Sequence, residues 1–172
     1  MIKALETQTN LQELAEFVVA RARLSGANLV SASLENACLA KADMEFALMA
    51  KALLRGACLR EADMSGAQLD GAVLTRADLQ KANLRGAGFR QAQLNGADLL
   101  GARLGGAFLV GASLQGADLR GAYLRLARLE DADLSDANLY DTQGLTQAQL
   151  ELAHCNSGTK LPKALRGTED AK

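Results

Sequence analysis

Few residues of this 172-residue chain could carry acid–base or nucleophilic chemistry. The only histidine, His154, is followed by Cys155, and this pair could supply a base and a nucleophile. The segment is expected to be helical, however, and adjacent residues on a helix do not face each other. The sequence has no Ser-His-Asp arrangement, phosphate-binding loop or cluster of metal ligands. We therefore expect no catalytic residue, no cofactor and no metal site, and the chain is not expected to be an enzyme.

A second group of reactive residues recurs at a spacing of 20. In order, the series is Cys38, Cys58, Asp78, Asp98, Asp118 and Asn138. If 20 residues make one coil, these side chains stack about 4.8 Å apart. Stacked carboxylates repel one another, so they could form a cation site or an acidic contact strip. The alternative, which we favour, is that each Asp belongs to a repeated motif and forms local hydrogen bonds.

Cys38 and Cys58 would lie one coil apart, within the Cα separation that a disulfide tolerates. Adjacent parallel strands offer poor geometry for that bond, so free thiols are the favoured interpretation. The chain has three cysteines, an odd number, and lacks an N-terminal basic segment followed by an apolar run. Both features favour a reducing cytoplasm over a secreted disulfide framework.

The spacing of these residues follows from a repeat of five. From Ala22 to Ala137, 24 successive positions at steps of five are all Ala. Two residues after each Ala stands a larger apolar residue, which is Leu except at Met44, Met49, Met64 and Phe89. The unit is Ala-x-Leu-x-x over residues 22–141.

A period of five suits neither an α-helix nor a flat strand. Five residues on a helix turn about 500°, which scatters the Leu residues around the axis. On a strand, an odd step places successive Leu residues on opposite faces. A short strand followed by a turn of about 90° keeps Ala and Leu pointing inward together. Four such turns close a square coil of 20 residues, so the chain is expected to be an all-β solenoid, a quadrilateral parallel β-helix of about six coils.

The turn residues agree with this geometry. The second residue after Leu is Gly in 11 of the 24 repeats, where a type II turn requires a positive φ. Repeats with Lys, Arg, Glu or Asp at this position are expected to use another turn type.

The flanking segments are expected to cap the open ends of the coil, which would otherwise invite filament growth. Three parts are predicted: an N-terminal helical cap over 1–21, the β-helix over 22–141, and a C-terminal cap and tail over 142–172. A helix is expected over 10–20, and Thr146 is expected to cap a second helix over 147–154. These caps favour a monomer, or an end-to-end homodimer, over an open filament.

The triplets Ala42-Asp43-Met44, Ala77-Asp78-Leu79 and Ala117-Asp118-Leu119 display an Ala-(Asp/Asn)-Leu-x-x pattern. This pattern resembles the pentapeptide-repeat family, which is common in bacteria and abundant in cyanobacteria. The resemblance implies a right-handed quadrilateral β-helix. Most members have no known biochemical function, and the best understood branch comprises quinolone-resistance proteins that mimic DNA and bind DNA gyrase.

The outward positions of the repeats carry any contact surface. Apolar residues there define a possible interaction patch over two adjoining faces: Val30, Leu48, Leu53, Val73, Phe108 and Val110. Cofactor-binding and catalytic residues are not assigned.

The charge distribution argues against two functions, which are binding to nucleic acid and mimicry of DNA. The chain carries 19 basic and 20 acidic residues, and the four faces of residues 22–141 sum to +1, 0, −1 and −1. A DNA mimic needs a continuous negative surface, and a nucleic-acid binder needs a basic stripe. No apolar stretch is long enough to span a membrane. We therefore expect a non-catalytic scaffold or protein-interaction module with a protein partner, and a gyrase-binding DNA mimic is the alternative.

Overall fold

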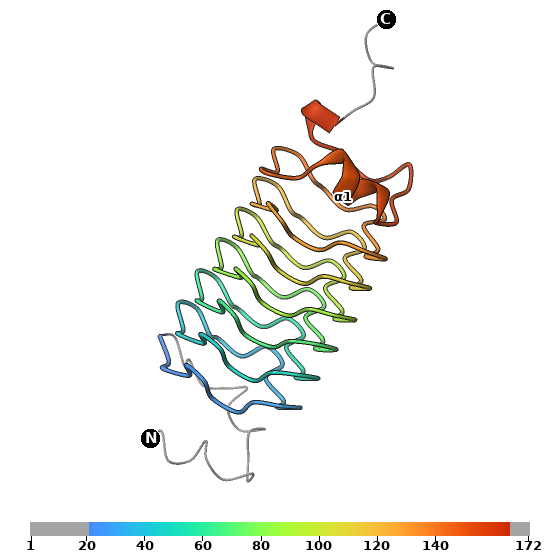
Figure 1. The fold of residues 1–172 in the computed structure, drawn as a ribbon. Helices are drawn as coiled ribbons and strands as arrows, with labels where there is room; N and C mark the ends of the chain where they lie inside the picture. Colours follow the sequence, from blue (N-terminus) through green and yellow to red (C-terminus); the bar gives the residue numbers. More distant parts are fainter. Residues whose placement is uncertain (1–20, 166–172) are drawn as a thin grey trace, which may run out of the picture.

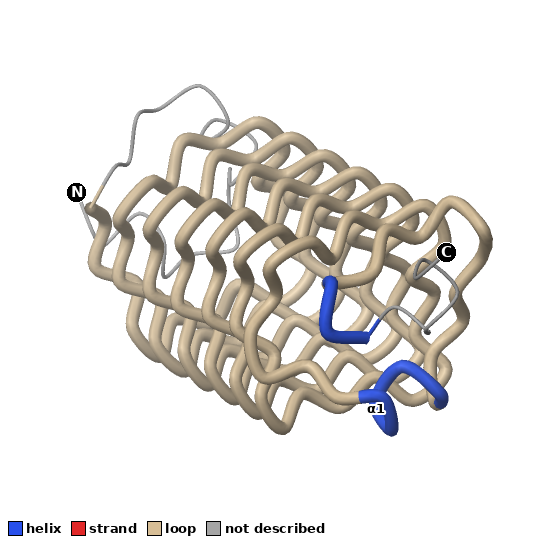
Figure 2. Tube along the Cα trace, turned by 90° about the horizontal axis from the view of Figure 1, so that it is seen from above, coloured by secondary structure: helices blue, strands red, loops and turns tan. Residues whose placement is uncertain are grey.

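The computed structural model describes residues 21–165, which wind into stacked coils along one axis (Figure 1). The chain is a right-handed quadrilateral parallel β-helix, as expected. The helix predicted over 10–20 and the tail beyond residue 165 lie outside the described residues. Helical segments among the described residues occur at the C-terminal end, beyond the regular coils (Figure 2).

Successive coils are joined by parallel bridges between residues 20 apart, beginning with Arg23↔Asp43 and continuing to Tyr123↔Gln143. Each bridge involves the single residue between an inward Ala and an inward Leu, so the strands are as short as the repeat predicts. Asp43 N donates to Ala22 O (2.8 Å), and Leu24 N donates to Asp43 O (2.6 Å). A third bond joins the corner residue to the next coil, as in Gly26 N to Glu45 O (2.7 Å).

The interior is filled by the repeated Ala and Leu positions. From Leu29 to Leu139, these residues are exposed by no more than 3%. Phe89 occupies one Leu position and is fully buried. No polar or charged residue among the described ones is buried with them. Burial of each large side chain contributes about 2 kcal/mol, so the coil is held by a continuous apolar column.

The corners correct one expectation. Every corner residue from Gly26 to Asp141, at steps of five, has a positive φ whether or not it is Gly. At most corners the following Ala N donates back to the Leu carbonyl, as in Ala27 N to Leu24 O (3.0 Å). A positive φ at the third residue and this closing bond are the pattern of a type II turn. The prediction of another turn type at Lys, Arg, Glu and Asp corners was therefore wrong.

The physical reason lies in the contacts between coils. A non-Gly residue in the left-handed region is disfavoured by about 1–2 kcal/mol. Its backbone N–H donates to the next coil, as in Lys51 N to Asp70 O (3.0 Å), and the flanking Ala and Leu are buried. A different turn would break both sets of contacts, so the coil imposes one corner geometry on every sequence.

The C-terminal end begins an incomplete seventh coil. His154 forms a bridge with Asp133, and Lys160 forms one with Asn138. Helix α1 (Gln147–Glu151) takes the place of the strand residue that would pair with Arg128. The 3₁₀-helix η3 (Lys163–Leu165) follows. Helix α1 ends at Glu151 rather than at the predicted residue 154, because the chain must return to an extended form to make the His154 bridge.

Two predicted features of this segment are confirmed. Thr146 is the N-cap of α1, and with Gln149 it forms a capping box. Leu150 is buried against the core. The Gln149 side chain also donates to Leu124 O (3.0 Å) and Ala127 O (2.8 Å). It thereby gives Ala127 O the donor that a further coil would supply, and it adds a second donor to Leu124 O, which already accepts from Ala127 N (3.0 Å). Among the described residues, no helix is long and apolar enough to cross a membrane.

Candidate interaction surfaces

The outward Asp and Asn residues form the local hydrogen bonds that we favoured for them. A side-chain oxygen accepts from the backbone N–H two residues later, as in Asp78 to Gln80 N (3.1 Å) and Asp98 to Leu100 N (3.0 Å). The same bond occurs at Asn28 and Asn138. At Gln80 and Leu100 this N–H, which precedes the corner, donates to no backbone carbonyl, so a short polar side chain supplies its partner.

In the stacked series Asp78, Asp98 and Asp118, the second carboxylate oxygen of each residue also has a partner. Arg60 donates to Asp78 Oδ2 (2.8 Å), Gln80 Nε2 donates to Asp98 Oδ2, and Arg120 donates to Asp118 Oδ2 (2.6 Å). The hydrogen bond from Arg120 lowers the pKa of Asp118. Within residues 21–165, no group of three or more His, Cys, Asp or Glu side chains could hold a metal ion. Asp78 and Asp118 are thus each paired with an Arg, whereas Asp98 accepts a hydrogen bond from the neutral amide of Gln80.

The residues of the predicted patch differ in exposure. Val30 is 49% exposed and Leu53 is 38% exposed, whereas Leu48, Val73 and Val110 are partly buried. Leu53 and Val73 are bridge partners in adjacent coils. The structure therefore brings together one pair of the patch on one face.

Phe108, the largest predicted patch residue, is covered by charged groups. The Arg90 guanidinium lies 4.6 Å from the ring centroid, and that of Arg128 lies 6.0 Å away. Asp70 Oδ1 accepts from Arg90 N (2.9 Å), and Arg128 Nε donates to Glu130 (2.9 Å). Cation–π contacts of this kind take the ring out of solvent, so Phe108 offers less free apolar surface than its sequence position suggests.

The two most exposed large apolar residues among those described lie outside the predicted patch. Phe46 is 64% exposed and Leu126 is 75% exposed, and both occupy corners, with φ of 55° and 61°. Both also belong to one corner column, which consists of Gly26, Phe46, Gly66, Gly86, Gly106 and Leu126. The other three corner columns all contain charged residues. The spacing of 20 that groups the Asp series also groups these corner residues, so this apolar corner column can be recognised from the sequence.

Between Phe46 and Leu126, the corners of this column are glycines, which have no side chain. A Cβ at Gly86 or Gly106 would meet no heavy atom within 4 Å, so these corners are open. At Gly66 a Cβ would lie 2.5 Å from the Phe46 ring, which shows that the ring lies over this glycine. The column therefore has the exposed Phe46 ring near one end, Leu126 at the other end, and open glycine corners between them.

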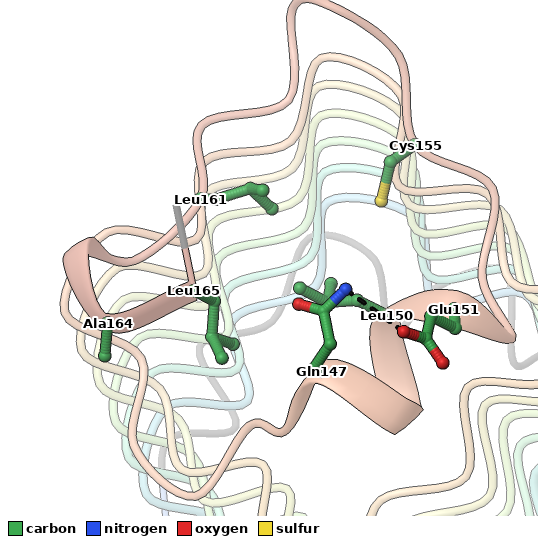
Figure 3. Close-up of a pocket in the computed structure, with 7 residues that line it drawn as sticks. All are labelled: Gln147, Leu150, Glu151, Cys155, Leu161, Ala164 and Leu165. Carbon is green, nitrogen blue, oxygen red and sulfur yellow. Dashed lines mark hydrogen bonds between the residues drawn. The ribbon is translucent and has the colours of Figure 1, made fainter. Parts of the chain in front are cut away.

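The C-terminal end carries a pocket of about 580 Å³ between α1 and the last described residues (Figure 3). Leu161 and Leu165 lie on one side, and Cys155 and α1 lie on the other. Burial raises the pKa of the Cys155 thiol, which disfavours the nucleophilic thiolate. His154 is exposed and forms a bridge with Asp133 of the preceding coil. His154 and Cys155 therefore lie in different surroundings, His154 beside Asp133 and Cys155 at the pocket.

Comparison with known proteins agrees with this architecture. The family model of pentapeptide repeats matches in eight copies over residues 18–45, 37–76, 72–111 and 109–142. The search of curated proteins found no match.

The chain is similar to several solved structures. A trypsin-treated variant of QnrB1, described as a plasmid-mediated fluoroquinolone resistance protein, is 17% identical over 84% of this chain and 86% of its own, with a TM-score of 0.55. The pentapeptide repeat protein alr5209 from Nostoc Pcc 7120 is 33% identical over 63% of this chain and 84% of its own, with a TM-score of 0.47. Rfr23 from the cyanobacterium Cyanothece 51142 is 26% identical over 69% and 63%, with a TM-score of 0.43. With its family model matched across most of its length, the chain belongs to the pentapeptide-repeat family.

Proposed function

We propose that this protein is a non-catalytic scaffold that binds a protein partner through its apolar corner column, residues 26, 46, 66, 86, 106 and 126. The observation that carries the proposal is the exposure of Phe46 and Leu126 at strained corners of that column. Proteins of this family are generally structural or interaction modules. A solenoid that presents two exposed apolar side chains along one edge suits that role.

The chemistry of these corners supports binding rather than packing. Gly is the residue of lowest strain at a positive φ, and polar residues such as Asn also tolerate it. Phe and Leu gain nothing there from core burial, and they expose apolar surface to water. Large exposed apolar side chains next to open backbone offer anchors for a partner, because aromatic and aliphatic groups that enter a partner's pocket dominate interface energies.

The predicted patch adjoins this column. Leu48 follows Phe46 by two residues, on the face that begins at the same corner. We propose that Leu48 extends the contact surface. Val30 and Val110 lie at the far end of the same face, before the next corner, and Leu53 and Val73 lie on the following face. Phe108 is shielded by Arg90 and Arg128.

The alternative function, DNA mimicry directed at gyrase, lacks support on the surface. The likeness to QnrB1, at 17% identity, shows the fold alone. The carboxylates at Asp78 and Asp118 are each paired with an Arg. We therefore expect no inhibition of gyrase supercoiling when this protein is present in large excess over the enzyme.

The test is affinity capture of partners from native lysate with three forms of the protein. The wild type is compared with a Phe46→Ser/Leu126→Ser variant, which removes both anchors. The matched control is Lys51→Ser/Gln91→Ser, which changes two corners of the same positive φ on another column.

We expect a partner that the wild type and the control retain and the Phe46→Ser/Leu126→Ser variant loses. Binding of that purified partner, measured by calorimetry, should weaken by at least about 10-fold for each anchor. Equal retention by all three forms would exclude the corner column as the contact surface. A Leu53→Ser/Val73→Ser variant then tests the neighbouring face.

A further inference from the structure

Cys38 and Cys58 are paired directly across two adjacent coils by a parallel bridge. Cys58 N donates to Ala37 O (2.9 Å), and Leu39 N donates to Cys58 O (2.7 Å). Because Ala37 and Leu39 point into the core, the intervening Cys38 points outward, and Cys58 does so by the same alternation. Both thiols are free and half-buried. Two thiol side chains therefore stand side by side on one face.

The polar groups beside this pair already have partners. Asp78, the next residue in the column, accepts from Gln80 N (3.1 Å) with one oxygen and from Arg60 with the other (2.8 Å). Arg60 follows Cys58 by two residues, and its guanidinium is held on Asp78, the bridge partner of Cys58 in the next coil. Positive charge therefore lies on the same face as the thiols, where it would stabilise an anionic metal–thiolate centre.

The spacing of the two strands selects a particular coordination. A zinc–thiolate bond is about 2.3 Å long, and two metal–sulfur bonds of similar length span about 4.6 Å when the ion lies in line between its ligands. Parallel strands are about 4.8 Å apart, so opposed thiolates from adjacent coils match this length. Zinc requires four ligands, and the column offers two. Soft thiolates instead select Cu(I), whose filled d shell imposes no geometry and permits two ligands.

We propose that Cys38 and Cys58 bind one soft monovalent cation of the Cu(I) class as a two-coordinate bis-thiolate. Each thiol releases its proton to solvent as its sulfur binds, so one ion is exchanged for two protons with no change of oxidation state. This site departs from the expectation of no metal, which was based on the lack of a cluster of three or more ligands. Two stacked thiols suffice for this class of ion.

The experiment titrates the reduced, intact protein with Cu(I) under anaerobic conditions against a competing Cu(I) chelator. We expect one tightly bound ion per chain, and X-ray absorption should show two sulfur neighbours. Cys38→Ser and Cys58→Ser should each weaken binding by about 100-fold or more, since each removes one of two ligands. Cys155→Ser, which removes the third thiol, should bind as the wild type does.

Thermal unfolding provides a second readout that does not depend on the competitor. Cu(I) should raise the Tm of the wild type and of Cys155→Ser, and it should leave the Tm of Cys38→Ser and of Cys58→Ser unchanged. Circular dichroism of the metal-free variants checks that each retains its coil. Wild-type affinity in Cys58→Ser, loss of binding in Cys155→Ser, or three sulfur neighbours around the ion would overturn the proposal.

Discussion

At the scale of single residues, the molecule depends on two local devices. Outward Asp and Asn side chains bind the N–H two residues later, and corner residues hold a positive φ. The first device explains why Asp recurs before Leu without any catalytic role. The second explains why Gly is frequent at corners, since Gly adopts this conformation without steric cost.

Leu126→Gly should stabilise the protein. The change removes left-handed strain at φ 61° and takes an exposed apolar side chain out of water. The larger conformational freedom of Gly in the unfolded chain offsets part of the gain. We expect the free energy of unfolding to rise by about 0.5–1 kcal/mol, measured by urea denaturation. Gly86→Ala, at an open corner of the same column, should lower it by about 1 kcal/mol, and a loss of stability in Leu126→Gly would contradict this account.

Stability should fall in acid through carboxylates such as Asp118 and Asp133. Their pKa values are lowered in the folded state by hydrogen bonds from Arg120 and Gln115 respectively. A lowered folded pKa contributes stability above the unfolded value of about 3.9, and that stability is lost as pH falls through the folded pKa. The urea midpoint of the wild type should therefore drop between about pH 5 and pH 2.

Asp118→Asn should show a smaller drop, because the amide cannot titrate. The comparison is made with Asp43→Asn, which removes an exposed carboxylate of the same local motif. Identical acid profiles for the wild type and Asp118→Asn would show that the Arg120 contact contributes nothing to stability.

At the scale of elements, the repeat is a one-residue strand and a turn, and neither is stable alone. Each repeat makes hydrogen bonds to the coils above and below, so the ends of the stack need other partners. At the C-terminal end these partners come from a returning main chain and from side chains. The Gln149 side chain donates to Ala127 O, and it adds a donor to Leu124 O, as Thr159 Oγ1 does to Leu134 O (3.0 Å).

Gln149→Ala should open this end of the coil. The change removes the donor to Ala127 O and one of the two donors to Leu124 O, and it removes one half of the α1 capping box. We expect a loss of about 1–3 kcal/mol, with faster hydrogen exchange over the last coil. Gln147→Ala, an exposed substitution in the same helix, is the control and should have little effect. Equal exchange in both variants would show that α1 is held without the Gln149 bonds.

At the scale of the whole molecule, stability is a sum of neighbouring coil contacts along one axis. Repeat proteins of this kind can lose structure locally, because each unit contacts mainly its neighbours. The Ala column makes this property testable. Each Ala lies at the wall of the core and leaves no space for a longer side chain; Ala97, for example, is 1% exposed.

Ala97→Arg should unfold the coils around residue 97, because an unpaired charge and a long side chain cannot be accommodated in the apolar column. Hydrogen exchange with mass spectrometry should show lost protection there before coils further away. Gly96→Arg places the same side chain on the adjacent corner, facing solvent, and should cost only the strain of a positive φ, about 1–2 kcal/mol. Retained protection in Ala97→Arg would contradict the packing described here.

The coil can be derived from the amino-acid sequence alone. An unbroken Ala-x-Leu-x-x period is incompatible with a helix or a flat strand, so the square section, the six coils and the buried column all followed from residue types and spacing. Thr146 and Leu150 could also be predicted, because capping and helix burial depend on short-range patterns.

The geometry of the surface depends on contacts that form when the coils stack. Corner geometry at residues such as Lys51 is imposed by bonds between coils, which overrides local turn preference. The shielding of Phe108 depends on Arg90 and Arg128, which lie about one coil before it and one coil after it in the sequence. The short α1 ends where the chain returns to make the His154 bridge. Local propensity is read from neighbouring residues, whereas these features depend on contacts made about one coil away, once the coils are stacked.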